Sequence, residues 1–105
     1  MKRVKPGVRV GFLKGPAWFA YDVADQVYAA HGEAECVLTS GTEGRHSPGS
    51  LHYQGLAIDL RLPVVQTRSE PIRAEIAERL GGDFDVLLEA LHIHIEFDVK
   101  VPYSA

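Results

Sequence analysis

A chain of 105 residues is the size of one domain, and its hydrophobic share of 46% and charged share of 24% are typical of a globular protein. A net charge of −3 gives no basic footprint for nucleic acid or for an anionic membrane surface, so we expect neither partner. The single cysteine, Cys36, cannot form an internal disulfide, and its place in an apolar run predicts a buried core residue.

We expect no export signal in the N-terminal segment. It lacks an apolar stretch followed by a small-residue cleavage site, and no run in the chain approaches the ~20 apolar residues of a membrane span. We therefore expect a protein that is cytoplasmic as synthesised. Lys2, Arg3 and Lys5 make this terminus basic, and we expect it to be a solvated tail.

The first half of the chain predicts one helix and two strands. Apolar residues recur at helical spacing across 16–31, with a proline in the first turn and Gly32 as the C-terminal cap. The short apolar run 34–39 is typical of a strand, and the segment 40–50, rich in glycine and serine, is typical of a loop. Residues 56–60 alternate between two faces and predict a second strand.

The second half of the chain predicts a further helix and a hairpin. An apolar stripe predicts a helix that begins at Ser69 or Pro71, with Ser69 as its N-cap, and stops at Gly81. The runs 84–88 and 92–97 predict two strands of a β-hairpin. Together these elements predict one α+β domain over the whole chain, with a small antiparallel sheet and two or three helices packed on one side.

The last predicted strand carries two histidines and a carboxylate on one face. Side chains alternate along a strand, so His92, His94 and Glu96 share a face, while the apolar residues between them face the core. Two imidazoles at this spacing can reach one metal ion, or one can bind the ion while the other stands beside it.

A histidine and an aspartate precede this strand at a spacing that lets them meet. His52 and Asp59 are seven positions apart, and the chain can turn between them at Gly55, which tolerates unusual dihedral angles and close approach. Imidazole and carboxylate ligands suit zinc, and three protein ligands with one open position are typical of a catalytic zinc site.

Each of these residues also has an ordinary structural interpretation. Asp59 would be a buried ion-pair partner of Arg61 or Arg73, and His52 would be a loop residue. The two histidines of the last strand would be polar residues on the wet face of an edge strand. The pattern alone leaves the metal site and these alternatives open.

Two segments resemble a known zinc superfamily. Residues 50–59, Ser-Leu-His-Tyr-Gln-Gly-Leu-Ala-Ile-Asp, resemble its signature Ser-x-His-x-x-Gly-x-Ala-x-Asp at every fixed position. The superfamily contains the D-alanyl-D-alanine peptidases, the lysostaphin-type endopeptidases and the hedgehog signalling domain. Residues 84–94 are similar to its carboxy-terminal metal segment, especially the hedgehog version, where a Phe-Asp strand leads to a glutamate and then to His-Ile-His. The resemblance covers 45–59 and 84–97, under a third of the chain.

The resemblance implies a role for each residue in these two segments. His52 and Asp59 would be the first two ligands of one zinc ion, and His94 would be the third. His92 would stand beside the metal, where it stabilises the reacting water or the tetrahedral intermediate. Glu89 would be the carboxylate that takes a proton from that water.

The spacing of the second segment leaves another assignment open. Two residues separate Glu89 from the His-x-His pair, whereas hedgehog has three. Other peptidases of the superfamily place the acidic base three residues before the third ligand, which would make His92 the ligand if Glu89 is the base. We favour His94 because the His-Ile-His match is close. Glu89 is the base candidate in both assignments, with Glu96 as a possible substitute.

Residues around the signature are expected to contact the substrate or to orient the ligands. We assign Arg45, His46 and Ser50 to the substrate pocket. Arg45 and Arg61 are the cations nearest the signature and are candidates to hold a substrate carboxylate, and the alternative for each is an ordinary solvated surface arginine. His46 lies where hedgehog-type members also carry histidine. Ser50 and Glu96 are also candidates for orienting the ligand imidazoles.

The resemblance implies a zinc metallopeptidase that hydrolyses a peptide bond in bacterial cell-wall stem peptides. The bond would be a D,D bond, as for a carboxypeptidase, or an L-Ala to D-Glu bond, as for an endopeptidase. A short single domain in which we expect no export signal fits a phage-encoded, endolysin-like protein that is released to the cell wall, or a cytoplasmic scavenger of wall peptides. The alternative is a hedgehog-like module that binds zinc without peptidase turnover.

Overall fold

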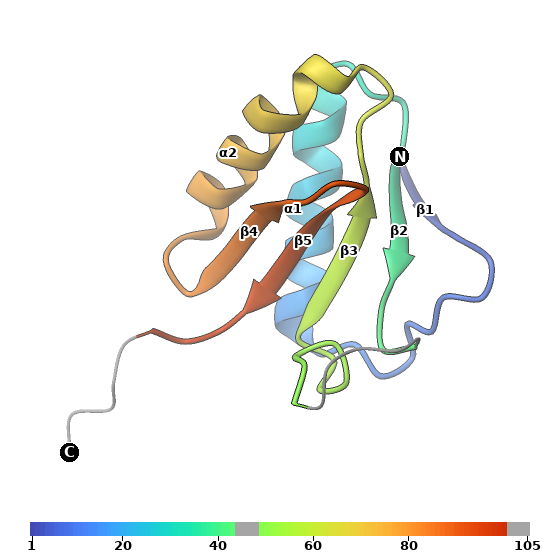
Figure 1. The fold of residues 1–105 in the computed structure, drawn as a ribbon, viewed down its shortest axis with the longest axis vertical. Coiled ribbons are helices and arrows are strands. Elements are labelled where there is room, and N and C mark those ends of the chain that lie inside the picture. The colour runs from blue at the N-terminus through green and yellow to red at the C-terminus, as the bar shows by residue number, and fades with distance from the viewer. Residues whose placement is uncertain (44–48, 101–105) are drawn as a thin grey trace.

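Two helices cover one face of a five-stranded sheet and leave the other face open (Figure 1). The computed structural model describes residues 1–43 and 49–100, and the counts refer to these residues. The strands are β1 (Lys2–Val4), β2 (Cys36–Ser40), β3 (Ala57–Arg61), β4 (Phe84–Leu88) and β5 (His92–Phe97). The helices are α1 (Gly15–Ala30) and α2 (Ser69–Leu80), and a short 3-10 turn, η1 (Gln66–Arg68), leads into α2.

The order of the strands brings the two sequence segments of interest side by side. Across the sheet the order is β1-β2-β3-β5-β4, with β1 parallel to β2 and every other neighbouring pair antiparallel. In the register of β3 and β5, Asp59 lies opposite His94 and Arg61 lies opposite His92. Side chains directly opposite each other on one face have Cβ atoms about 5 Å apart, so this register places acidic and imidazole groups in contact range.

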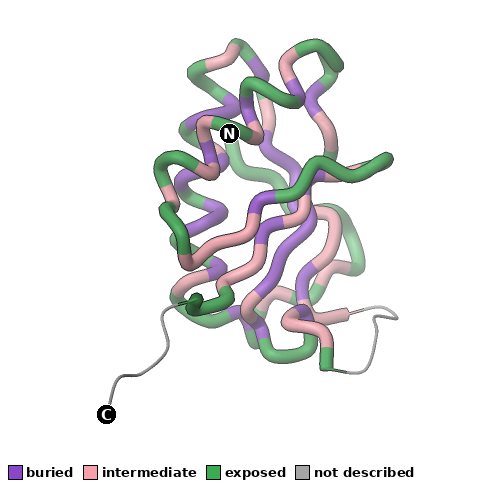
Figure 2. The backbone as a smooth tube through the Cα atoms, turned by 60° about the vertical axis from the view of Figure 1, so that its left-hand side comes forward, coloured by how far each residue is buried: buried purple, intermediate pink, exposed green. Residues whose placement is uncertain are grey.

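The hydrophobic core fills the space between the sheet and the helices. The inward-facing isoleucines and leucine of β3 and β5 are at most 1% exposed, and buried residues follow the central strands and the inner side of the helices (Figure 2). Fully burying one such side chain contributes about 1.5–3 kcal/mol. Two tyrosines of α1 also form hydrogen bonds to the sheet. Tyr28 donates to the carbonyl of Arg61 in β3 at 2.7 Å, and Tyr21 donates to the carbonyl of Cys36 in β2 at 3.0 Å. Burial raises the pKa of Tyr21 to about 12, so its hydroxyl stays protonated as a donor.

The predicted α+β architecture is confirmed. The helices expected over 16–31 and from 69 or 71 to 80 correspond to α1 and α2, and the four expected strands correspond to β2, β3, β4 and β5 within two residues at each end. Cys36 is fully buried, as its apolar surroundings predict. No helix of the described ranges has both the length and the apolar character needed to cross a membrane.

The prediction of a solvated N-terminal tail is wrong for the backbone. Residues Lys2–Val4 form the edge strand β1, and the hydroxyl of Tyr21 lies 2.8 Å from the carbonyl oxygen of Arg3, so the carbonyls of Arg3 and Cys36 share its one hydrogen. The side chains of this strand remain exposed, and Lys2 forms an ion pair with Asp22. All three residues of this strand are exposed. Their sequence therefore has no alternation of polar and apolar side chains that would predict a strand.

The start of α2 also differs from the prediction. Arg68 occupies the N-cap position, and Ser69 is already helical, with φ −62° and ψ −51°. The turn η1 runs directly into the helix, so the Ser69 hydroxyl caps no backbone amide. At the other ends the predicted glycines are confirmed, because Gly32 and Gly81 both follow a helix with positive φ angles of 89° and 88°.

A buried carboxylate, Glu33, joins the turn after α1 to the segment before η1. Its two oxygens accept the backbone amides of Val64 and Val65, and the guanidinium of Arg68 lies 2.7 Å from Oε2. The Glu33 side chain is only 4% exposed. Burial acts against the charged form, but the amides and the Arg68 guanidinium outweigh it and hold the pKa of Glu33 below its ordinary value.

We predict that Glu33→Gln lowers the free energy of unfolding at pH 7 by about 2 kcal/mol, because a neutral amide forms weaker hydrogen bonds with Arg68 and the two backbone amides. A lowered native pKa contributes stability above the ordinary carboxyl value of 4.5, and this contribution is lost as the pH falls through the native pKa. Urea unfolding at pH 7 and near pH 3 measures the effect, and the two proteins should differ less at the lower pH.

Glu70→Gln is the control for this experiment. Glu70 pairs with Arg73 on the exposed side of α2, and an exposed pair of this kind contributes little to stability. A loss of stability as large as that of Glu33→Gln would contradict the role given to the buried carboxylate.

Candidate metal centre

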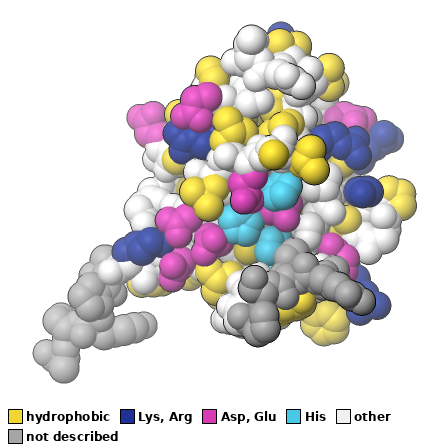
Figure 3. Space-filling model, viewed as in Figure 1, with side chains coloured by type: hydrophobic (Ala, Val, Ile, Leu, Met, Phe, Trp, Pro, Cys, Tyr) yellow, Lys and Arg dark blue, Asp and Glu magenta, His cyan; other side chains and the backbone are white. Residues whose placement is uncertain are grey.

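The open face of the sheet carries a group of histidines and carboxylates. His92, His94 and Glu96 alternate along β5 with the buried Ile93 and Ile95, as the strand period predicts. Figure 3 shows the histidine side chains gathered near the middle of this face with acidic side chains around them. The described structure therefore brings together segments that lie far apart in the sequence.

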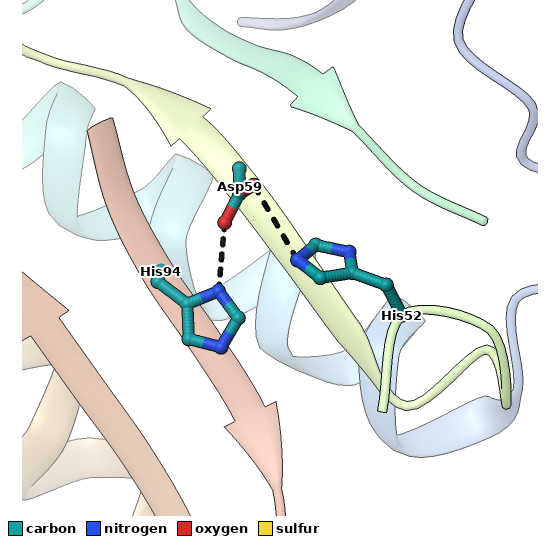
Figure 4. Close-up of side chains that lie close together, drawn as sticks. All are labelled: His52, Asp59 and His94. Carbon is teal, nitrogen blue, oxygen red and sulfur yellow. Dashed lines mark hydrogen bonds and ion pairs between the residues drawn. The ribbon is translucent and has the colours of Figure 1, made fainter. Parts of the chain in front are cut away.

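Three side chains form the buried part of this group. His52, Asp59 and His94 each offer one ligand atom, and these atoms all lie within 4.8 Å of one another. Asp59 lies between the two imidazoles (Figure 4): its Oδ1 is 2.7 Å from Nδ1 of His94, and its Oδ2 is 3.4 Å from Nε2 of His52. The centroids of the two imidazole rings are 5.1 Å apart. His52 is 3% exposed and Asp59 is 7% exposed.

A glycine turn carries His52 to this position. The amide of Gly55 donates to the carbonyl of His52 at 3.1 Å, and Gly55 has a positive φ angle of 71°. A Cβ atom at this position would lie 2.1 Å from the carbonyl oxygen of Phe12, so only glycine fits. The unusual dihedral angle and the close approach expected of Gly55 are both present.

A backbone carbonyl orients the ring of His52. Nδ1 lies 2.8 Å from the carbonyl oxygen of Gly41, so Nδ1–H donates there and Nε2 faces Asp59. Gly41 is itself held, because Glu43 Oε1 accepts its amide at 2.8 Å and the amide of Arg9 at 2.9 Å. Sequence reasoning missed Gly41, because a carbonyl acceptor has no side chain to mark it.

Ser50 does not orient this ring as proposed from the sequence. Its Oγ accepts the backbone amide of His52 at 3.2 Å, and this contact holds the start of the glycine turn instead of the imidazole. Its position two residues before His52 nevertheless keeps it beside the site.

Glu96 orients the ring of His94, as the sequence suggested. Oε1 of Glu96 lies 2.9 Å from Nε2 of His94, so Nδ1 faces Asp59. Burial acts to lower the pKa of His94, but hydrogen bonds to Asp59 and Glu96 outweigh it and raise the pKa to about 8. Burial likewise opposes ionisation of Asp59, yet hydrogen bonds from His52 and His94 hold its pKa well below its usual range. Asp59 and Glu96 therefore favour the protonated, positively charged form of His94, which contacts both carboxylates.

His92 and Glu89 lie at the outer edge of the group. Nε2 of His92 is 3.0 Å from Oε1 of Glu89 and 3.5 Å from Oδ1 of Asp59. The side chains of His92 and Glu89 are 33% and 47% exposed, compared with 14% for His94. The buried position beside His52 and Asp59 is occupied by His94, so the geometry favours His94 over His92 as the third ligand.

The remaining candidate residues have different outcomes. Arg45 and His46 lie outside the described residues. Arg61 is exposed at the end of β3, and Arg73 pairs with Glu70, so neither is the partner of Asp59 in the described structure. The carboxylate of Asp59 contacts histidines instead.

No protein-family model matches this chain.

The donor set of His52, Asp59 and His94 fits zinc, because two imidazole nitrogens and a carboxylate oxygen are ligands that zinc prefers. Each imidazole also has the outer hydrogen-bond partner that metal-ligating histidines require, the Gly41 carbonyl for His52 and Glu96 for His94. His52, Asp59 and His94 are therefore a set of described residues that could hold a metal ion.

We predict that the purified protein binds zinc tightly and that His52→Ala or Asp59→Asn abolishes this binding. Glu96→Gln should weaken the affinity by about 10–100-fold, because the orienting carboxylate of His94 is lost. Competition with a chromophoric chelator measures all three. Asp85→Asn is the matched control: Asp85 lies on the same open face, opposite Glu96 in the register, but pairs with Lys100. If Asp59→Asn binds zinc as well as the wild type, these residues are not the ligands.

Proposed function

We propose that this protein is a zinc-dependent metallopeptidase that hydrolyses a peptide bond in bacterial cell-wall stem peptides. One observation carries the proposal: a buried set of three ligands, His52, Asp59 and His94, lies directly beside the half-exposed pair of Glu89 and His92. A catalytic zinc site needs an adjacent proton acceptor and an approach for substrate, and the half-exposed pair supports the proposal because it would supply both.

Each of the three ligand residues would bind the ion through an atom that the structure already points into the site. His52 would bind through Nε2, His94 through Nδ1 and Asp59 through its carboxylate, while Gly41 and Glu96 keep the rings in place. A zinc ion bound here would lower the pKa of a water molecule towards ~7 and polarise the scissile carbonyl. The chain's own contribution is a fixed arrangement of donors, so little reorganisation is needed during the reaction.

Glu89 and His92 are suited to the proton transfers. The carboxylate of Glu89 would accept a proton at the mouth of the site and pass it to the leaving amine. His92 lies between Glu89 and Asp59 and would donate through Nε2–H to the oxygen on which negative charge develops. Both residues are accessible to a substrate, in contrast to the buried ligands.

The substrate class is proposed from the resemblance of residues 50–59 and 84–94 to cell-wall peptidases. The partly exposed side chains of Glu89 and His92 would be the point at which a peptide approaches the site. Arg61 is exposed next to His92 in the register and would hold a carboxylate of the peptide. An endolysin-like protein of this size would meet such a substrate after release to the cell wall.

One observation favours a zinc-binding module without turnover as a second candidate. Oε1 of Glu89 contacts His92, and nearly half of the Glu89 side chain is exposed. A carboxylate oxygen that already contacts an imidazole is less available to accept a proton from a water molecule. The spacing of two residues between Glu89 and the His-x-His pair points the same way.

We predict that the protein releases product from purified stem peptides and that Glu89→Gln lowers kcat by about 10²–10⁴-fold without loss of the tightly bound zinc, because only the proton acceptor is removed. Peptides ending in a D,D bond and peptides with an L-Ala to D-Glu bond are assayed separately by mass spectrometry. Glu78→Gln, on the exposed side of α2, is the control and should hydrolyse at the wild-type rate.

Two results would change the assignment. Equal rates for the wild type and Glu89→Gln would remove Glu89 from the proton-transfer step. Zinc binding without product from either peptide would favour the non-catalytic module.

A further inference from the structure

A second set of ligand atoms lies beside the first. Asp59, Glu89 and His92 each offer one ligand atom, and these atoms also lie within 4.8 Å of one another. Nε2 of His92 is central to the set, at 3.0 Å from Oε1 of Glu89 and 3.5 Å from Oδ1 of Asp59. One imidazole nitrogen and two carboxylates suit zinc as well as the first set does.

The two sets meet at Asp59. Its Oδ2 faces Nε2 of His52, and its Oδ1 faces both His94 and His92. A carboxylate has two oxygens and can bridge two ions, and ions in two-metal sites lie ~3.5–4 Å apart. His92 and Glu89 are not needed for the first set, so both remain to bind a second ion.

The second set differs from the first in exposure. His92 and Glu89 are one-third and nearly one-half exposed, so an ion can enter and leave without opening the fold. Arg61, the register partner of His92, adds positive charge to this end of the face. Both features make binding weaker here than at the buried set.

We propose that Asp59, Glu89 and His92 form a second, weaker zinc site that shares Asp59 with the first. We further propose that zinc at this site inhibits hydrolysis, a step that rests on the function proposed above. Glu89 then donates its lone pair to the metal and cannot accept a proton, and His92 coordinates through Nε2 and loses its N–H donor. Low free zinc would support activity, and higher free zinc would suppress it.

Equilibrium dialysis over a range of free zinc, followed by elemental analysis of the protein, tests the site without any assay of turnover. The wild type should reach one equivalent at low free zinc and two at high free zinc. Glu89→Gln and His92→Gln should each keep the tight equivalent and lose the weak one. Glu89 is exposed in the connection between β4 and β5, and thermal unfolding of the variants verifies that they are folded.

Asp85→Asn distinguishes the proposed site from a neighbouring acidic group. Asp85, Glu96 and Asp98 also lie close together, and Lys100 contacts two of these carboxylates. Asp85→Asn should retain both equivalents. The proposal is overturned if Asp85→Asn loses the weak equivalent, if Glu89→Gln retains it, or if the wild type never exceeds one equivalent.

The inhibition is tested with the wild type in the stem-peptide assay. Activity should fall over the same range of free zinc in which the second equivalent binds, and should recover when free zinc is lowered with a buffer. Full activity at two equivalents would overturn the inhibitory role. Two bound equivalents without hydrolysis of any peptide would support the second site and contradict the peptidase function together with its inhibition.

Discussion

The antiparallel pairing of β3 with β5 sets Asp59 directly opposite His94, and the other contacts of the site are arranged around that pair. The same register points Ile58 and Ile95 into the core on the reverse face. A slip of one residue would turn His94 inward and an isoleucine outward. The hydrophobic core therefore fixes the geometry of the polar site, because neither face of these strands can change without the other.

Buried carboxylates are compensated in two different ways in this protein. Glu33 is matched by a guanidinium and two backbone amides, groups that keep their character at any ordinary pH. Asp59 is matched by imidazoles, whose charge depends on a bound proton. The first arrangement is a permanent structural tie. In the arrangement around Asp59, a metal ion can replace the proton on the imidazoles. Metal binding is therefore coupled to folding and to pH.

Local patterns in the sequence predicted what is local in the structure. The helices and the hairpin follow from periodicity, and the shared face of His92 and His94 follows from strand alternation. The choice between these two histidines could not follow, because it is made by the register against β3, a long-range property. The contact with the carbonyl of Gly41 could not be predicted either, since every residue carries the same backbone acceptor. Strand β1 pairs through its backbone alone, without an amphipathic pattern.

The three buried ligands come from a glycine turn, from β3 and from β5, so the chain segments they join span a large part of the sequence. With a single cysteine, the chain has no internal disulfide to close such a loop. An ion bound by His52, Asp59 and His94 would act as a reversible cross-link that restricts the unfolded chain between its ligands. Resistance to unfolding and to proteolysis would then depend on the zinc supply of the surroundings.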